Sequence, residues 1–157
     1  IPATEAPEPK EIFEIGMGES PGDRAAAVEA FRRMGEVAGD AVAQALTLID
    51  GLVVIGGGIS AAHPLFLQPL VDAMNALYQR DHDPLRRLIP KAFNLEDPEQ
   101  AGEFLTSKVR EITVPGSGRK VLYDPSPRTA VGISRLGTSR AVAVGAAAYA
   151  LSRLGDG

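Results

Sequence analysis

Three consecutive glycines, Gly56-Gly57-Gly58, are the residues of this sequence that most directly suggest ligand chemistry. They follow Leu52-Val53-Val54-Ile55, an apolar run typical of a strand buried on both faces of a sheet. Because glycine lacks a Cβ, the chain can take positive φ here and let a flat or anionic ligand group approach the backbone. The amides beyond the turn, at Ile59 and Ser60, would face that ligand. The pattern predicts a ligand-binding turn at the carboxyl end of a strand.

A dinucleotide is one ligand that would fit this turn on sequence grounds. The stretch from Gly56 to Ala61 satisfies G-x-G-x-x-[GA], the fingerprint of a dinucleotide-binding module. That fingerprint also requires a second strand ending in an acidic residue about 20 positions further on. Asp72 falls within a predicted helix and Asp81 follows one, so a Rossmann-type module is the lesser alternative. Ser60 has two equal interpretations, a hydrogen bond to a ribose hydroxyl or a cap on the next helix.

Periodicity predicts the elements that hold this turn. A capping sequence, Ser20-Pro21-Gly22-Asp23, opens an amphipathic helix over Asp23–Ile49. Its apolar residues recur at Val28, Phe31, Met34, Ala38, Val42, Ala45 and Ile49. A second helix is predicted over Pro64–Gln79, with Leu77 and Tyr78 on its apolar stripe. Residues 1–22, which contain four prolines, are predicted to form a linker or the start of the lobe, with a possible strand at Glu11–Ile15.

The second half of the chain alternates strands and helices. A short helix is expected around Glu99–Ser107, and Pro115-Gly116-Ser117-Gly118 separates two β-prone runs that predict a hairpin. The remaining expected elements are a strand at Thr129–Ile133 and a last helix at Thr138–Arg153. Such alternation indicates the α/β class, with all three long helices packed on a sheet that contains Leu52–Ile55.

Composition excludes several classes of protein. The formal net charge is −4, and six carboxylates lie within residues 1–23, so a nucleic-acid binder is not expected. There is no cysteine, which excludes disulfides and thiolate zinc sites in this chain and fits the cytoplasm. No apolar run reaches the roughly 20 residues of a membrane span. His63 is expected to be a turn residue, and His82, between two aspartates, a solvated loop residue rather than a metal ligand.

The glycine turn and the last helix together resemble the ROK family of sugar kinases. That family commonly shows an "LDP-x-x-I-V-I-GGG" segment, which is similar to the sequence from Ile49 to Gly58 with Gly51 in place of the proline. The segment 141–147 is similar to the family's final "a-x-x-GAA" helix, which packs beside the glycine turn. Glu11–Gly18, Asn94–Pro98 and Arg110–Gly116 look most like the bacterial glucokinases of the family. The likeness extends from about Glu11 to Leu154.

The resemblance implies an actin-like (ribonuclease H-like) ATPase fold of two lobes, with residues 23–157 as the C-terminal nucleotide-binding lobe. Its mixed sheet would be flanked by helices. It implies an ATP-dependent hexose kinase in which Gly56, Gly57, Gly58, Ile59 and Ser60 contact adenosine and magnesium is held mainly through the phosphates. The family's D-x-GG-T phosphate motif, catalytic aspartate and zinc cluster have no counterpart in this sequence. No catalytic or metal-binding residue is therefore assigned here, and the sugar would bind through the other lobe.

Other expectations concern the whole protein. A start at Ile1 within a Pro/Glu-rich stretch favours the interior of a longer chain. ROK-type transcriptional regulators share the sugar-kinase body, so a sugar-responsive regulator is the alternative to a kinase. The acidic composition and the glucokinase-like Asn94–Arg110 region favour the kinase. A homodimer is possible.

Overall fold

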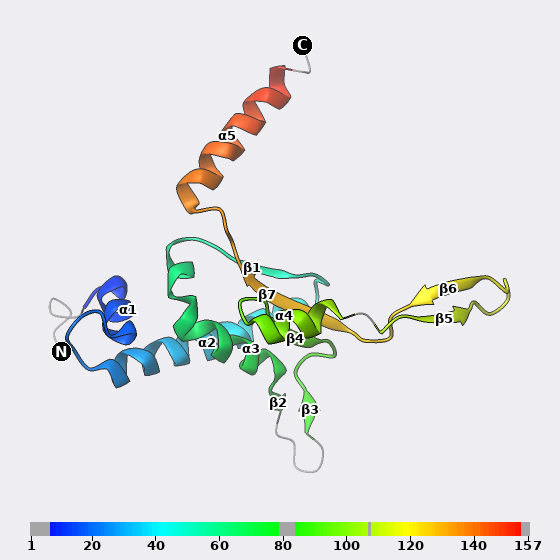
Figure 1. Ribbon diagram of the computed structural model, residues 1–157, viewed down its shortest axis with the longest axis horizontal. Coiled ribbons are helices and arrows are strands. Elements are labelled where there is room, and N and C mark those ends of the chain that lie inside the picture. The colour runs from blue at the N-terminus through cyan, green and yellow to red at the C-terminus, as the bar shows by residue number, and fades with distance from the viewer. Residues whose placement is uncertain (1–6, 79–83, 107, 155–157) are drawn as a thin grey trace.

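The computed structural model describes residues 7–78, 84–106 and 108–154. Its main sheet has three parallel strands in the order β1 (Val53–Ile55), β7 (Arg128–Ile133) and β4 (Lys91–Asn94). Two antiparallel hairpins accompany this sheet (Figure 1). One joins β2 (Leu77–Tyr78) to β3 (Leu85–Arg86), and the other joins β5 (Arg110–Thr113) to β6 (Lys120–Tyr123). The predicted strands at the glycine turn and at Thr129–Ile133 and the predicted hairpin are confirmed.

The N-terminal segment forms a helix where the sequence predicted a loop or a short strand. Helix α1 (Pro9–Met17) begins with a proline in its first turn and ends at Gly18, whose φ is 81°. Proline fits the first turn because its absent N–H would have no partner there. The Phe13 ring meets the Phe31 ring edge-on, with centroids 6.4 Å apart. The expected loop or strand at Glu11–Ile15 is therefore wrong, because these residues belong to α1, which packs on the next helix.

Helix α2 (Arg24–Leu46) is capped by Asp23, whose Oδ1 accepts a hydrogen bond from the Ala26 amide at 3.0 Å. Its buried face consists mainly of small residues, namely Ala27, Phe31, Gly35, Gly39 and Ala43. This differs from the predicted stripe of larger apolar residues, since Val28 and Met34 are exposed. A Cβ on Gly35 would lie 2.4 Å from the Phe66 carbonyl oxygen, so α2 runs in backbone contact with its neighbour α3.

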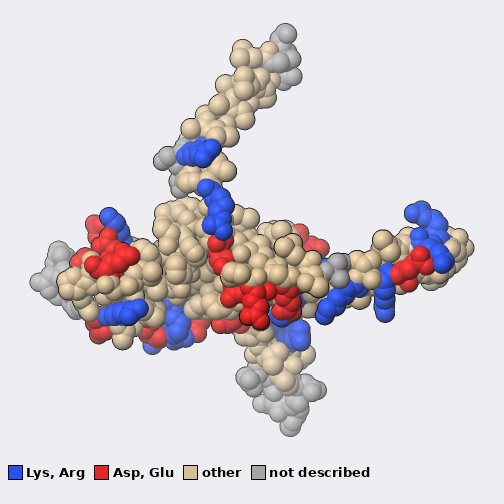
Figure 2. Space-filling view, in the orientation of Figure 1, with Lys and Arg blue, Asp and Glu red and all other residues tan. Residues whose placement is uncertain are grey.

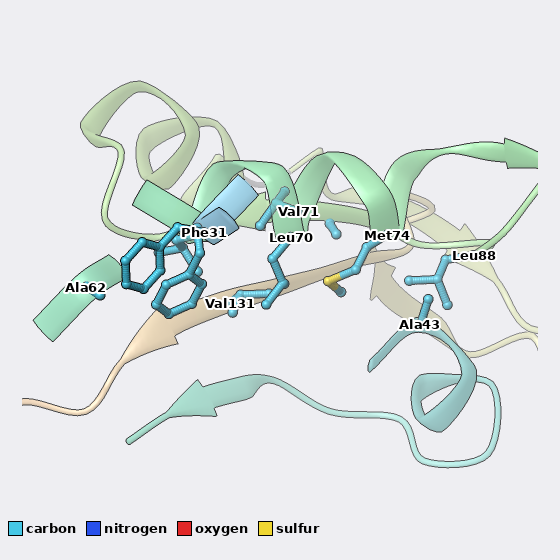
Figure 3. Packing of buried hydrophobic residues seen from close by; sticks show 11 residues of the cluster. Phe31, Ala43, Ala62, Leu70, Val71, Met74, Leu88 and Val131 are labelled. Carbon is cyan, nitrogen blue, oxygen red and sulfur yellow. The ribbon is translucent and has the colours of Figure 1, made fainter. Parts of the chain in front are cut away.

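Helix α3 (His63–Asn75) supplies most of the core, which lies between the helices and the sheet (Figure 3). Leu70, Val71 and Met74 of α3 are fully buried together with Val131 of β7. The Asn75 side chain joins the end of α3 to β4 by donating to the Ala92 carbonyl and accepting from the Ala92 amide, both at 2.9 Å. The helix ends at Asn75 rather than at the predicted Gln79, which lies outside the described residues. Leu77 and Tyr78 pair with β3 instead.

Helix α4 (Pro98–Leu105) is capped by Asp97 and lies beside β4 and β7. Lys91 of β4 reaches Glu103 of α4 at 2.8 Å, and the Phe93 and Phe104 rings pack with centroids 5.8 Å apart. These contacts confirm the short helix predicted around Glu99–Ser107. Strand β4, which the sequence did not predict, completes the sheet.

Helix α5 (Thr138–Leu154) stands away from the sheet, contrary to the prediction that it packs on the sheet beside the glycine turn. Residues 140–154 are all exposed, including Val142, Tyr149 and Leu151. The neighbouring face of β1 is open as well, since Val54 is 68% exposed while Val53 and Ile55 are half-buried against the core. The prediction of a strand buried on both faces is therefore wrong for Val54. In the part of the chain that the structure describes, no helix is long and apolar enough to cross a membrane.

Candidate nucleotide-binding site

The glycine turn lies at the carboxyl end of β1, as predicted. Gly57 has φ 85° and ψ −172°, a conformation that disfavours every residue with a side chain. A Cβ on Gly57 or Gly58 would meet no atom within 4 Å, so both glycines border open space. Gly56 is closer to its surroundings, because a Cβ there would lie 3.5 Å from the Ser134 Cβ. The turn thus presents bare backbone that a ligand can approach.

A short 3₁₀ helix (Gly58–Ala62) carries the chain from this turn into α3. The Ser60 hydroxyl donates to the Gly57 carbonyl at 2.7 Å, and the Ser60 amide donates to the same oxygen at 3.2 Å. His63 Nδ1 lies 3.1 Å from the Ser60 carbonyl oxygen, so it acts as the donor in that contact. The Ser60 side chain therefore closes the turn on itself and does not cap α3, contrary to one of its two interpretations. His63, expected to be a turn residue, is the first residue of α3.

A cavity of about 490 Å³ opens between this 3₁₀ helix and α1. Gly58, Ile59, Ala61 and Ala62 form one wall, and α1 with its neighbours forms the other; Pro9, Lys10, Phe13, Glu14, Glu19 and Phe31 are its remaining lining residues. Ile59 is 40% exposed and offers an apolar surface at the rim. The cavity combines aromatic and aliphatic walls with a few charged groups, which is the character of a small-molecule site.

The sequence predicted only one side of this cavity. Lys10, Phe13 and Glu14 are not predicted as lining residues because the proline-rich segment indicates a loop, and a loop offers no fixed wall. A signal for α1 is present, since Pro9 and Glu11 in a first turn and Gly18 at the end match the usual asymmetry of helix termini.

Polar groups lie at the carboxyl ends of β1, β7 and β4, on the same edge of the sheet as the glycine turn. The Ser134 amide donates to the Ile55 carbonyl at 2.8 Å, which fixes the end of β7 beside Gly56. Beyond β4, the Glu96 carboxylate accepts from the Ile133 amide at 3.1 Å and lies 2.7 Å from Arg135 Nη2. Arg135 thereby joins the end of β7 to the loop that follows β4. No local sequence signal predicts this pair, because its members are 39 residues apart.

The strand order argues against the dinucleotide module. The strand beside β1 is β7, and the Thr129 hydroxyl donates to the Gly51 carbonyl across a separation of 78 residues. A dinucleotide fingerprint needs the next strand along the chain beside the first. Here the next strand, β2, belongs to a separate hairpin.

The described residues also contain no group of three or more His, Asp or Glu side chains arranged to hold a metal ion.

Comparison with known proteins gives one informative likeness. No protein-family model matches the chain, and no match was found among curated protein sequences. The crystal structure of a glucokinase from Parabacteroides distasonis is similar, with a TM-score of 0.78 and 44% sequence identity over 94% of this chain. This chain spans 39% of the length of that glucokinase. The predicted fold class, an α/β lobe of a kinase fold, is confirmed by this likeness.

Proposed function

We propose that this chain is the C-terminal, nucleotide-binding part of an ATP-dependent hexose kinase of the ROK family, similar to glucokinase. The observation that carries the proposal is the cavity of about 490 Å³ between α1 and the glycine turn. The 44% identity to a glucokinase over 94% of the chain supports the hexose kinase class over a regulator. The whole protein would act in the cytoplasm on glucose or a related sugar.

The cavity suits the base of ATP. Phe13 and Ile59 offer apolar surface to a flat ring, while Lys10 and Glu14 can exchange hydrogen bonds with its edge. Open space beside Gly57 and Gly58 would admit the ribose against bare backbone. This assigns adenosine contacts to Gly56, Gly57, Gly58, Ile59 and Ser60.

Magnesium would be held mainly by the ATP phosphates and by residues beyond this chain. The ion neutralises the charge that develops on the transferred phosphoryl group. The part of the chain described here offers no carboxylate cluster for it. The hexose would bind through the other lobe, so this chain's role is to hold and orient the nucleotide.

A tryptophan that fills the cavity is expected to prevent nucleotide binding. Ala61 lines the cavity and is exposed, so Ala61→Trp places a large ring where the base would lie. Isothermal titration of the chain with ATP should show at least a tenfold higher Kd for this variant. The matched control is Ala45→Trp, an exposed position near the far end of α2. Equal ATP affinity in both variants and in the unmodified chain would refute the adenosine site.

The chain by itself is expected to show no hexose kinase activity. No residue in it matches the family's catalytic aspartate, the base that accepts the proton of the attacking sugar hydroxyl. Positioning of ATP alone does not supply that group. A coupled assay of ADP release with glucose, run beside ATP titration on the same sample, checks this. Glucose-dependent turnover by the purified chain would overturn the assignment of roles.

A further inference from the structure

We infer that Glu14 selects the base of the nucleotide, favouring adenine over purines that carry an oxygen in place of its exocyclic amine. The inference rests on the proposed ATP site and names the residue that decides its specificity. Among the described residues that line the cavity of about 490 Å³, the side chains with nitrogen or oxygen atoms are those of Lys10, Glu14 and Glu19. Side-chain readout of a base in this cavity therefore falls to one ammonium group and two carboxylates.

The cavity brings an aromatic ring and a carboxylate together on one face of α1. Lys10, Phe13 and Glu14 are three and four residues apart, and all three line the cavity. Phe13 meets the buried Phe31 edge-on, which fixes the orientation of its ring. Gly58, on the opposite wall, adds no side chain. A flat base lying against Phe13 thus has an edge beside Glu14, the next residue along α1.

The Glu14 carboxylate is the most enclosed of the three polar groups. The Ser20 hydroxyl donates to its Oε2 at 3.3 Å, and Lys10 Nζ lies 3.6 Å from its Oε1. The Glu14 side chain is 33% exposed, whereas that of Lys10 is 84% exposed and Glu19 is exposed as well. A polar group shielded from water discriminates more strongly than a solvated one, because water cannot replace a missing ligand hydrogen bond. Glu14 is therefore the group that decides which base binds.

Charge places the base, rather than the phosphates, against α1. Residues 8–19 contain four carboxylates and one lysine. Figure 2 shows acidic residues gathered over the end of the molecule where α1 lies. A triphosphate is repelled by this charge and lies toward the glycine turn, so the uncharged base occupies the end of the cavity beside Glu14.

A carboxylate accepts hydrogen bonds and donates none, so Glu14 matches a base that offers an N–H group at this edge. The exocyclic amine of adenine is such a group, whereas a carbonyl oxygen takes its place in hypoxanthine and guanine. Two acceptors would then face each other without a proton between them, and the hydrogen bond would be lost. The chain is thus expected to bind ATP in preference to inosine triphosphate.

Glutamine in place of Glu14 should remove this preference. Glu14→Gln keeps the size of the side chain and an oxygen for the Ser20 hydroxyl, and it adds an amide N–H that can donate to a carbonyl oxygen. Isothermal titration should give the unmodified chain a Kd for inosine triphosphate about tenfold or more above that for ATP, and Glu14→Gln a ratio below about three. The matched control, Glu11→Gln, removes the same charge from an exposed side chain of α1 outside the cavity and should keep the original ratio.

The ratio of the two Kd values separates base selection from a structural role, because a loosened α1 weakens the binding of both nucleotides alike. An unchanged ratio in Glu14→Gln would overturn the inference and leave the ATP site standing. The same follows if the unmodified chain binds inosine or guanosine triphosphate as tightly as ATP. A chain that binds no nucleotide at all would instead overturn the proposed function, and this inference with it.

Discussion

Replacing Gly39 with alanine is expected to destabilise the chain by roughly 3 kcal/mol. A Cβ on Gly39 would lie 2.3 Å from the Leu70 carbonyl oxygen and 2.8 Å from the Ala73 Cβ. Neither a main-chain oxygen nor a helix-bound methyl group can turn aside, so α2 and α3 must move apart and loosen the core between them. Urea unfolding followed by circular dichroism should show a lower midpoint with an unchanged slope.

The control for Gly39→Ala is Gly102→Ala. Gly102 lies inside helix α4, and a Cβ there would meet nothing within 4 Å. Alanine is favoured over glycine in an open helical position by up to about 1 kcal/mol, so this variant should be neutral or stabilising. If Gly39→Ala lowers the free energy of unfolding and Gly102→Ala raises it, the backbone contact at Gly39 is the cause of the loss. A loss of stability at Gly39 no larger than that at Gly102 would contradict the close packing.

Replacing Gly57 with valine is expected to raise the Kd for ATP by at least tenfold. A Cβ at this position would enter the open space proposed for the ribose. The substitution also strains the backbone, because φ is 85° and a branched side chain disfavours positive φ. ATP titration should therefore be accompanied by a thermal melt without nucleotide.

Gly116→Val separates strain from ligand contact. Gly116 has φ 82°, and a Cβ added to it would meet no atom within 4 Å, as at Gly57, but Gly116 lies in the turn of the β5–β6 hairpin. Both valines would occupy positions of positive φ, so a loss of thermal stability is expected for each. Only Gly57→Val should weaken ATP binding. Unchanged ATP affinity in folded Gly57→Val protein would remove the support for the glycine turn as a nucleotide contact.

The sequence predicted elements whose signals are local. The signals for the start of α2, at Ser20-Pro21-Gly22-Asp23, and for the hairpin around Pro115-Gly116-Ser117-Gly118 each lie within a few residues of the structure they determine, although Asp23 and not the expected Ser20 is the cap. Strand β4 escaped prediction because its four residues between Pro90 and a helix cap show no period, and its burial comes from α3 and α4. The packed face of α2 was misjudged for a similar reason, since its glycines are buried by contact with α3, which periodicity alone does not reveal.

In the candidate site, too, the features with local sequence signals were predicted and those set by distant contacts were not. Its glycine turn was predicted because a backbone that needs positive φ selects glycine directly. To predict the α1 wall of the cavity, one must recognise a short helix in a proline-rich segment. To predict the Glu96–Arg135 pair, one must know the strand order, because that order brings two distant loops to one edge of the sheet. Helix α5 does not pack beside the glycine turn in this structure, contrary to the prediction. Periodicity predicts that the helix forms but not what it packs against.

The strand order also governs how this chain can fold during synthesis. Strand β7 is the middle strand of the main sheet but the last of its strands to be made. Until it emerges, β1 and β4 have no shared neighbour, and the later pairing must close a loop of 78 residues between Gly51 and Thr129. Closing such a loop is slow compared with joining α2 to α3, which are adjacent in sequence. The helical pair is thus expected to act as the early template, with the sheet forming in a single late step when β7 enters between its two waiting neighbours.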